Sequence, residues 1–208
     1  HMVMHDHEKD DVLHETYVKP RHSWFPCGAA LASYVLTDKG GKTTETAMVG
    51  REGMVGGLTT DGHGCTFPRA TVRVRGPFLR IPNTELEKAR EHSTTIRRWL
   101  ARYADCLVAQ VFQEIACSKS HSVTERAAKW LLEAQMRTGA REITMTQEDM
   151  AQLLGVGRTF VNRVISELRD QGLIETRRGL IRIGNEPALR KISCDCHDTV
   201  AGHFKSMF

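Results

Sequence analysis

The sequence predicts an α+β chain in which a β-rich N-terminal part precedes a long helix and a small module of helices and one hairpin. Three observations support this fold class. Short alternating or apolar segments, separated by Gly-containing turns, fill the chain up to about residue 83. Helical periodicity starts at about residue 84. Capped helices and a second alternating stretch follow residue 121. We therefore divide the chain into residues 5–83, 84–120, 121–193 and a Cys- and His-containing tail, 194–208.

The N-terminal part shows four segments with the composition of strands, at residues 29–36, 43–49, 71–75 and 78–81. Between the first two lies Asp38-Lys39-Gly40-Gly41, a run of turn-forming residues, so we expect these segments to form a hairpin. A Gly-rich run at 50–64 separates the hairpin from the later segments.

The long helical region carries an apolar seam whose members are four and three residues apart: Ile96, Leu100, Tyr103, Leu107 and Val111. Such a seam requires an apolar surface to cover it. A second copy of the helix would provide one, with these residues at the interface of a homodimer. The alternative is that the seam packs against the chain's own β-rich part.

A further helix is predicted after this region. Ser122-Val123-Thr124-Glu125 has the pattern of a capping box, in which the first and last residues satisfy each other's backbone N–H groups. The helix is expected to end near Gly139 and to link the long helix to the module that follows. Its expected buried side chains are Ala127, Ala128, Trp130, Leu131 and Leu132.

Two short helices around a glycine turn come next. Thr146 can cap the first helix, and Glu148 and Asp149 place negative charge in its first turn, where the helix dipole favours it. Gly155 ends this helix because Gly adopts the left-handed conformation without steric cost. The side chains expected to point inward are Met150, Leu153 and Leu154.

The second short helix has two distinct faces. Its expected buried residues are Val161, Val164, Ile165 and Leu168. Its polar face carries Arg158, Thr159, Asn162, Arg163, Ser166 and Arg169. Gly172, followed by two apolar residues, is expected to close its C-terminal end.

This layout is that of a helix-turn-helix DNA reader. In the major groove, Arg suits guanine and Asn suits adenine. Arg158 and Asn162 are one helical turn apart, as are Thr159 and Arg163, so the four side chains can meet base edges together. The alternative is an ordinary solvated helix face.

Residues 174–183 favour the DNA interpretation. They alternate around Arg178-Gly179 and predict a two-stranded wing. Arg177, Arg178 and Arg182 lie near one surface of it, where they suit phosphate contacts. The module is therefore predicted to be a winged helix-turn-helix whose partner is double-stranded DNA. Because such proteins commonly read two half-sites, we prefer the homodimer interpretation of the seam and expect a two-fold symmetric operator.

Composition narrows the class of protein. The 208-residue chain has a formal net charge of +4 and a sequence pI of 8.8, so its basic groups must be clustered locally to attract DNA. The sequence contains neither an apolar run of about 18 residues nor a signal peptide. It also lacks a nucleophile elbow, a phosphate loop, an HExxH motif and paired carboxylates. We predict a cytoplasmic protein that is not an enzyme.

The six cysteines show no disulfide framework and indicate a reducing compartment. Cys194-Asp195-Cys196-His197, with His203 nearby, could bind zinc or copper or act as a redox pair. The preferred interpretation is an exposed tail with incidental thiols. Four N-terminal histidines are likewise expected in solvent rather than at a metal: His5, His7, His14 and His22.

The order of these elements resembles the Crp/Fnr family of bacterial transcription regulators, named after the cyclic-AMP receptor protein and Fnr. The resemblance covers nearly the whole chain and is strongest at residues 122–183. In the N-terminal half, residues 12–15, 24–26 and 48–56 are similar to segments of the family's β-roll. The resemblance implies a β-roll of cyclic-nucleotide-binding type, here shortened, a dimerisation helix, and RNA polymerase as a further candidate partner.

The resemblance also assigns residues to DNA. It places base contacts at Arg158, Thr159, Asn162 and Arg163. It and the wing pattern place phosphate contacts at Thr146, Gln147, Ser166, Arg177, Arg178 and Arg182. Many members have Glu where this chain has Thr159. Since Glu accepts a hydrogen bond from cytosine and Thr is less selective, we expect a different target sequence.

The effector pocket departs from the family pattern. Cyclic-nucleotide-binding members hold the ribose with the Glu of a Gly-Glu-Leu turn, and this chain has Gly56-Gly57-Leu58. Arg69 could stand at the phosphate position, while Val111 and Phe112 replace the hydroxyls offered to adenine. A buried adenine edge without partners is penalised. We therefore do not expect cyclic AMP in a pocket formed by Gly57, Arg69, Val111 and Phe112, and the effector and cofactor stay unassigned.

An alternative function follows from the tail. Cys194, Cys196 and His197 would then be the switch of a metal- or thiol-responsive regulator.

Overall fold

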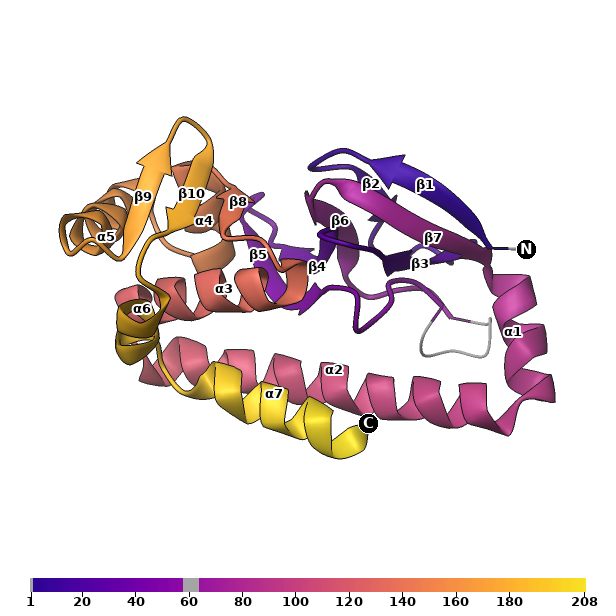
Figure 1. The fold of residues 1–208 in the computed structure, drawn as a ribbon. Coiled ribbons are helices and arrows are strands. Elements are labelled where there is room, and N and C mark those ends of the chain that lie inside the picture. The colour runs from indigo at the N-terminus through magenta and orange to yellow at the C-terminus, as the bar shows by residue number, and fades with distance from the viewer. Residues whose placement is uncertain (1, 58–63) are drawn as a thin grey trace.

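The structure, a computed structural model, describes residues 2–57 and 64–208. A β domain stands at one end and a second, mainly helical module at the other (Figure 1). The long helix α2, Thr94–Ser120, runs beneath both of them. This arrangement confirms the predicted fold class, in which an N-terminal β part, a long helix and a helix-turn-helix follow one another.

The β domain consists of two antiparallel sheets, with strand orders β2-β6-β4-β5 and β1-β7-β3. The β4–β5 hairpin predicted from the sequence is confirmed, with Thr37 opposite Thr43. The Asp38 carboxylate closes its turn by accepting hydrogen bonds from the backbone N–H groups of Gly40 (2.8 Å) and Lys42 (2.9 Å). The strand bounds are Val3–His7 (β1), Val12–His14 (β2), His22–Pro26 (β3), Leu31–Thr37 (β4), Thr43–Val49 (β5), Arg69–Val74 (β6) and Gly76–Pro82 (β7).

The N-terminal histidines are packed rather than solvated, which corrects the expectation from sequence. The rings of His5, His7 and His22 surround Trp24, with centroids 5.9, 4.8 and 6.0 Å from its ring. His14 is buried, and burial lowers the pKa of its imidazole. These residues stand at alternate positions of short strands, so their rings extend the apolar face of the sheets.

Two helices follow the sheets where the sequence predicted one long region. α1 spans Asn83–His92, and α2 begins at Thr94. The break falls at Ser93, which has extended backbone angles and whose hydroxyl accepts a hydrogen bond from the N–H of Ile96 (3.3 Å). Ser93 is therefore the N-cap of α2, a role that Ser favours over a helix interior.

The predicted apolar seam of α2 packs against the β domain of its own chain. Leu100 and Tyr103 are buried in the core of that domain, and the Tyr103 hydroxyl donates to the carbonyl of Met54 (3.2 Å). Ile96, Leu107 and Val111 are partly buried against the same core. The alternative interpretation of the seam thus describes the structure, because the β domain offers an apolar surface beside the helix. Leu100 and Tyr103 are not accessible to a partner helix.

A different face of α2 is apolar and exposed. Val108, Phe112 and Ile115 have 49, 67 and 51% of their surface exposed, and they too are four and three residues apart. At 100° per residue this stripe is centred about a third of a turn around the helix from the buried seam, so the seam can pack on the β domain while the stripe stays exposed. The long helix therefore carries two apolar stripes, of which the described part of the chain covers one.

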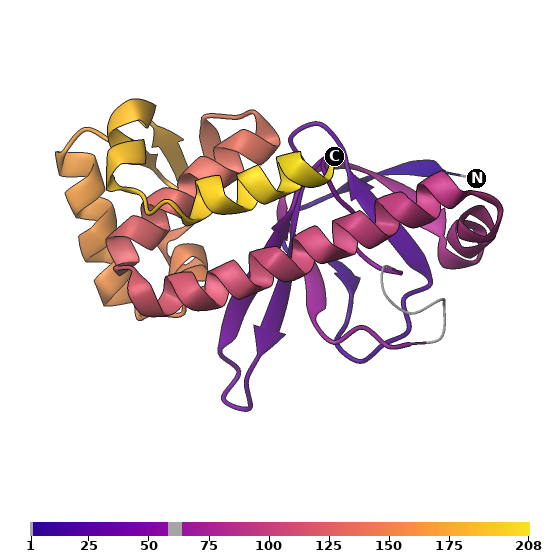
Figure 2. The same cartoon turned by 90° about the horizontal axis from the view of Figure 1, so that it is seen from below.

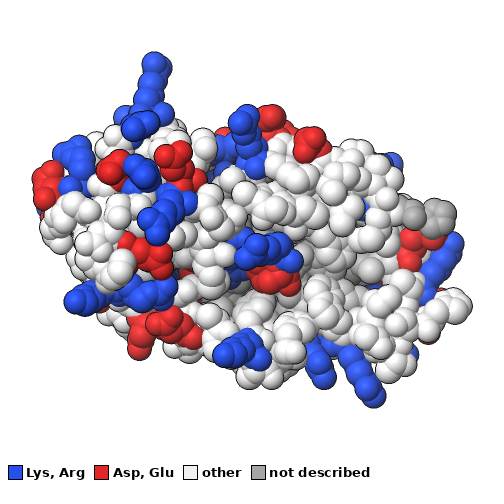
Figure 3. Space-filling view, viewed as in Figure 1, with Lys and Arg blue, Asp and Glu red and all other residues white. Residues whose placement is uncertain are grey.

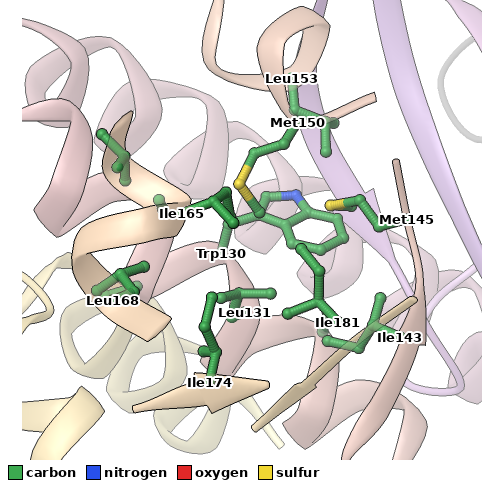
Figure 4. Packing of buried hydrophobic residues seen from close by; sticks show 14 of the residues in the cluster. Trp130, Leu131, Ile143, Met145, Met150, Leu153, Ile165, Leu168, Ile174 and Ile181 are labelled. Atoms are coloured by element: carbon green, nitrogen blue, oxygen red, sulfur yellow. The ribbon is translucent and has the colours of Figure 1, made fainter. Parts of the chain in front are cut away.

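Helix α3, Val123–Thr138, joins the two halves of the molecule. Its capping box is confirmed, with the Ser122 hydroxyl and the Glu125 carboxylate accepting from each other's backbone N–H groups. Gly139 ends the helix in the left-handed conformation, with φ of 71°. The five expected side chains are buried, and Trp130 lies at the centre of the second core, beside Met150 and Ile165 (Figure 4).

The C-terminal residues form two more helices, α6 (Glu186–Ile192) and α7 (Cys196–Met207). Figure 2 shows α7 lying along α2. His203 contacts Asp105 (2.9 Å), and the Gln113 amide donates to the Cys196 sulfur (3.1 Å). The expectation of an exposed tail is wrong, because this helix covers α2 and buries Cys194, Cys196 and His197.

Within the described residues, no helix is both long enough and apolar enough to cross a membrane.

Candidate DNA-binding surface

The helix-turn-helix consists of α4, Gln147–Leu154, and α5, Arg158–Asp170. Thr146 caps α4 as predicted, since its hydroxyl accepts from the N–H of Asp149 (3.1 Å). The Asp149 carboxylate in turn accepts from the N–H of Thr146 (2.7 Å). Gly155 ends the helix with φ of 67°. Local signals therefore fix both ends of α4, and with them the point where the chain turns into α5.

Helix α5 presents the polar face that the sequence predicts. Its four expected apolar residues are buried in the core around Trp130. Gly172, with φ of 69°, closes the end of the helix by donating to the carbonyl of Arg169 (2.8 Å). The side chains exposed to solvent on α5 include Arg158, Thr159, Asn162 and Arg163. Because the core anchors the opposite side, this row faces outward as one rigid surface.

The wing is three-stranded, since β8 (Glu142–Thr144) joins the predicted pair β9 (Ile174–Arg177) and β10 (Leu180–Ile183). Arg177 and Arg178 are exposed at its turn, where Gly179 has φ of 70°. Arg182 lies on the sheet instead and pairs with Glu175 (3.4 Å) and Glu142 (3.9 Å). Two of the three predicted phosphate ligands are therefore at the tip, and the third is partly neutralised.

A groove of about 490 Å³ brings several predicted residues together. It lies between the wing, the start of α4 and the start of α5. Thr146, Gln147, Arg158, Arg177 and Arg178 line it. Predicted phosphate ligands from two elements thus flank Arg158, the first predicted base reader. Ser166 and Asn162 lie further along α5 and do not line this groove.

The basic groups of this surface are largely free of acidic partners. Within the described part of the chain, Arg158, Arg163, Arg177 and Arg178 take part in no ion pair. Arg169 is different, because it contacts Asp170 (3.4 Å) and the hydroxyl of Ser166 (3.5 Å). Basic side chains project from the module in Figure 3, with acidic ones among them. The free cations are therefore those nearest the wing tip and the start of α5.

Sequence reasoning missed Phe160, which is 45% exposed on α5. The guanidinium of Arg163 lies 5.9 Å from the centre of its ring, within cation–π range. The sequence does contain a signal for it, because Phe160 is an apolar residue outside the predicted buried stripe of residues 161, 164, 165 and 168. Phe160 holds Arg163 beside an aromatic ring, and it adds an apolar group to the polar face.

The predicted effector pocket is only partly assembled. A pocket of about 290 Å³ in the β domain is lined by Gly57 and Val111, together with Tyr34 and Thr46. Arg69 is not in this lining and pairs with Glu15 (3.3 Å) at the start of β6. Phe112 is on the exposed face of α2 and does not line this pocket. Leu58 of the Gly-Gly-Leu turn and part of the Gly-rich run lie outside the described residues.

The tail cysteines belong to a cluster that the sequence did not predict. Cys117, His121, Cys194 and Cys196 place their sulfur and nitrogen atoms within 4.8 Å of one another. His197 is not among them, because its ring faces the Glu133 carboxylate (3.6 Å). Cys117 and His121 come from the end of α2, far away in sequence, so spacing within the tail could not reveal them.

Comparisons with known proteins agree with this geometry. Residues 125–192 match the Crp-like helix-turn-helix domain family. FixK2 from Bradyrhizobium japonicum is similar in structure with a TM-score of 0.77 at 18% identity, over 93% of this chain and 98% of that one. A CRP-family regulator from Thermus thermophilus has a TM-score of 0.75 at 17% identity, over 91% of this chain and 96% of that one. The c-di-GMP-responsive regulator CLP of Xanthomonas campestris has a TM-score of 0.69 at 14% identity, over 89% of this chain and 95% of that one. No curated protein sequence matches significantly. The chain thus carries a Crp-like helix-turn-helix on the Crp/Fnr fold.

Proposed function

We propose that this Crp/Fnr-type DNA-binding regulator acts as a homodimer in which each α5 reads one half-site of a two-fold symmetric operator. The main support is the exposed face of α5, whose Arg158 and Arg163 have no acidic partner within the described residues. Arg158 also lines one groove with the free arginines of the wing. Unpaired guanidinium groups on a rigid helix suit base and phosphate contacts, because no internal ion pair must be broken first.

Within α5, different residues have different tasks. Arg158 suits a guanine and Asn162, one turn further on, suits an adenine. Thr159 and Arg163 complete the row, and Thr159 discriminates less because a hydroxyl both donates and accepts. Arg163 reads a base from beside the ring of Phe160, which restricts its motion.

Phosphate contacts come from the groove around Arg158. Arg177 and Arg178 reach one DNA strand from the wing tip, while Thr146 and Gln147 hold a phosphate at the start of α4, where the helix dipole attracts anions. Ser166 and Arg182 are weaker contributors, because Ser166 contacts Arg169 and Arg182 is paired with two glutamates. These contacts position the protein without reading the sequence.

The proposed dimer forms through the exposed stripe of α2. Val108, Phe112 and Ile115 have the 4-3 spacing of a helix pair and are left uncovered by the described part of the chain. Two copies of α2 packed along this stripe would place the two α5 helices about a common two-fold axis. This interface replaces the one predicted from Ile96, Leu100, Tyr103, Leu107 and Val111.

Selection of bound sequences from a random DNA pool tests the function. We expect an enriched palindrome with guanine and adenine at positions that Arg158→Ala and Asn162→Ala respectively relax. The matched control is Arg97→Ala, since Arg97 is an exposed arginine of α2 far from α5. Absence of any enriched sequence, with the wild-type protein folded, would contradict the proposal.

Sedimentation tests the dimer. Phe112→Asp places a charge in the stripe and should convert dimers to monomers. Phe67→Asp is the control, because Phe67 is similarly exposed in the β domain. A wild-type monomer at all concentrations would exclude the α2 interface.

A second candidate function is favoured by the Cys/His cluster. Its three thiols and one imidazole suit a regulator that responds to a metal ion or to thiol oxidation. Cys194 and Cys196 would have the role that the alternative interpretation of the tail gave them, with Cys117 and His121 in the place of His197.

A further inference from the structure

The Cys/His cluster lies where three segments of the chain meet. Cys117 is in the last turn of α2, and His121 is the residue that ends this helix. Cys194 lies between α6 and α7, and Cys196 is the first residue of α7. The cluster therefore joins the end of the long helix to the start of the C-terminal helix, beside the junction of α2 with α3.

Two distances within the cluster match the edges of a tetrahedron around one small ion. The sulfurs of Cys117 and Cys194 are 3.6 Å apart, and the Cys196 sulfur is 3.5 Å from Nδ1 of His121. Zinc–sulfur and zinc–nitrogen bonds of about 2.3 and 2.0 Å at tetrahedral angles give edges of about 3.8 Å and 3.5 Å. A disulfide would instead require about 2.05 Å between sulfurs. These two pairs thus stand almost at the spacing of coordinated ligands, and all four ligand atoms lie within 4.8 Å of one another.

Packing does not account for the three cysteines. They are buried, yet they cluster with one another and not with either of the two apolar cores. A cysteine that serves as a small apolar side chain contacts other apolar side chains. Three sulfurs grouped around an imidazole are the donor set of a structural zinc site, Cys₃His.

A hydrogen-bond donor, a helix N-terminus and a buried cation lie beside the sulfurs. The Gln113 amide donates to Cys196, and such outer hydrogen bonds orient metal ligands. The Cys196 sulfur is also at the N-terminus of α7, and the buried cation Lys129 acts on Cys117.

We infer that Cys117, His121, Cys194 and Cys196 bind a single thiophilic divalent cation, and that Zn²⁺ fits this donor set best. Soft thiolate ligands with one imidazole disfavour Mg²⁺ and Ca²⁺, which take oxygen ligands. A small pocket of about 110 Å³ has Cys194 in its lining.

Binding would fix α7 on α2. It would also restrain the junction of α2 with α3, because His121 directly precedes Ser122, the N-cap of α3. Because α3 carries the helix-turn-helix core, the ion would restrain the angle at which α5 meets DNA. This regulatory consequence rests on the proposed function, whereas the metal site does not.

Metal content and cobalt spectra of the full-length protein test the site. We expect about one Zn²⁺ per chain after purification, and Co²⁺ in its place should give the intense visible bands of a tetrahedral thiolate complex. Cys117→Ser and Cys196→Ser should each lower the affinity at least about 100-fold, since even an outer-shell partner is worth about 10–100-fold. Gln113→Leu should give a smaller loss in that range.

Matched controls separate ligation from folding. Cys27→Ser and His197→Ala remove a thiol and an imidazole outside the cluster and should leave the metal content unchanged. His121→Ala serves as a second ligand variant, since it removes a ligand at a helix end and adds no polar atom to the interior. Each variant's circular dichroism spectrum shows whether it folds, and added Zn²⁺ should raise the melting temperature of the wild type stripped of metal by a chelator but not that of the ligand variants.

Three results would overturn the inference. One is a folded, reduced protein that takes up neither Zn²⁺ nor Co²⁺. A second is a Cys117–Cys194 disulfide in the isolated protein. The third is iron and sulfide in protein purified without oxygen, which would mean a cluster in place of one ion. DNA binding with and without a chelator is measured separately, so a protein that binds zinc but no operator would refute only the regulatory consequence.

Discussion

Basic side chains have opposite surroundings in two regions of the molecule. On the DNA-reading surface two of them are exposed and, within the described residues, unpaired, and inside the molecule two others are buried and paired. On the surface, Arg158 and Arg178 are exposed and have no acidic partner within the described residues. Inside the molecule, Arg137 and Lys129 of α3 are buried and paired with Glu52 of the β domain and Glu114 of α2. Unpaired charge is available to a ligand, whereas paired buried charge fixes how α3 sits on the β domain and on α2.

Further polar contacts cross the boundary between the β domain and the helical module. The buried Glu45 carboxylate accepts from the indole of Trp130 (2.7 Å) and lies 3.4 Å from Arg73. Lys9 pairs with Asp149 at the start of α4 (3.0 Å), and Lys42 donates to the carbonyl of Gly155 at its end (2.8 Å). Loops of the β domain therefore hold both ends of the first helix of the reader. The orientation of that module depends on a few specific groups.

The largest effect on stability is expected when one of the buried ion pairs is broken. Arg137→Met removes the partner of Glu52 and the donor to the carbonyl of Met48 (2.9 Å) while keeping an unbranched side chain. Loss of one partner of a buried pair should lower the free energy of unfolding by about 3 kcal/mol. Urea unfolding measures it. Arg158→Ala is the control and should stay within about 0.5 kcal/mol of wild type. Equal losses of unfolding free energy for the two variants would contradict the distinction between buried, paired cations and exposed, unpaired ones.

The next largest effect is on DNA affinity, and it concerns the exposed, unpaired arginines. Arg158→Ala should weaken binding to the selected operator by about 1–3 kcal/mol and relax one base position, without changing stability. Fluorescence anisotropy on the operator and on single-base variants measures both quantities. A uniform loss on all sequences would make Arg158 a phosphate ligand instead.

Arg178→Ala should act more weakly and without sequence preference. Removing one phosphate contact should flatten the plot of log K against log salt by about 0.9. Titrations at several salt concentrations, on operator and random DNA, test it. The matched variant is Arg182→Ala, for which a smaller change is expected because Arg182 already pairs with Glu175.

The smallest effect is a pH dependence within the β domain. Burial lowers the pKa of His14 below its ordinary 6.5. The unfolded chain therefore binds this proton more readily than the folded one, and stability decreases as pH falls below about 6.5. His14→Gln should reduce this slope, measured as unfolding free energy between pH 7 and 5. An unchanged slope would show that His14 takes up its proton equally in both states.

The reader module could be predicted from sequence because its signals are local. Thr146, Gly155 and Gly172 mark helix ends within a few residues of where they act, and the wing follows from alternation around Gly179. Capping and turn chemistry depend on neighbours in the chain, so no knowledge of the tertiary structure is needed.

The long helix and the tail could not be predicted in the same way. Spacing identifies an apolar stripe on α2 but not the surface that covers it, and the exposed stripe through Phe112 has the same 4-3 period as the buried one. Cys117 and Cys194 meet only because α7 folds back along α2. Such contacts depend on the whole fold, and a Cys-x-Cys pair alone does not reveal them.

Helix α2 has three faces, and they are occupied differently. The β domain covers one and α7 covers another, so a partner helix on the stripe through Phe112 would leave the middle of α2 without contact to solvent. Its backbone amides would then exchange hydrogen for deuterium only when the dimer dissociates or the whole chain unfolds. The exchange rate of α2 would thus vary with protein concentration, while that of the wing would not.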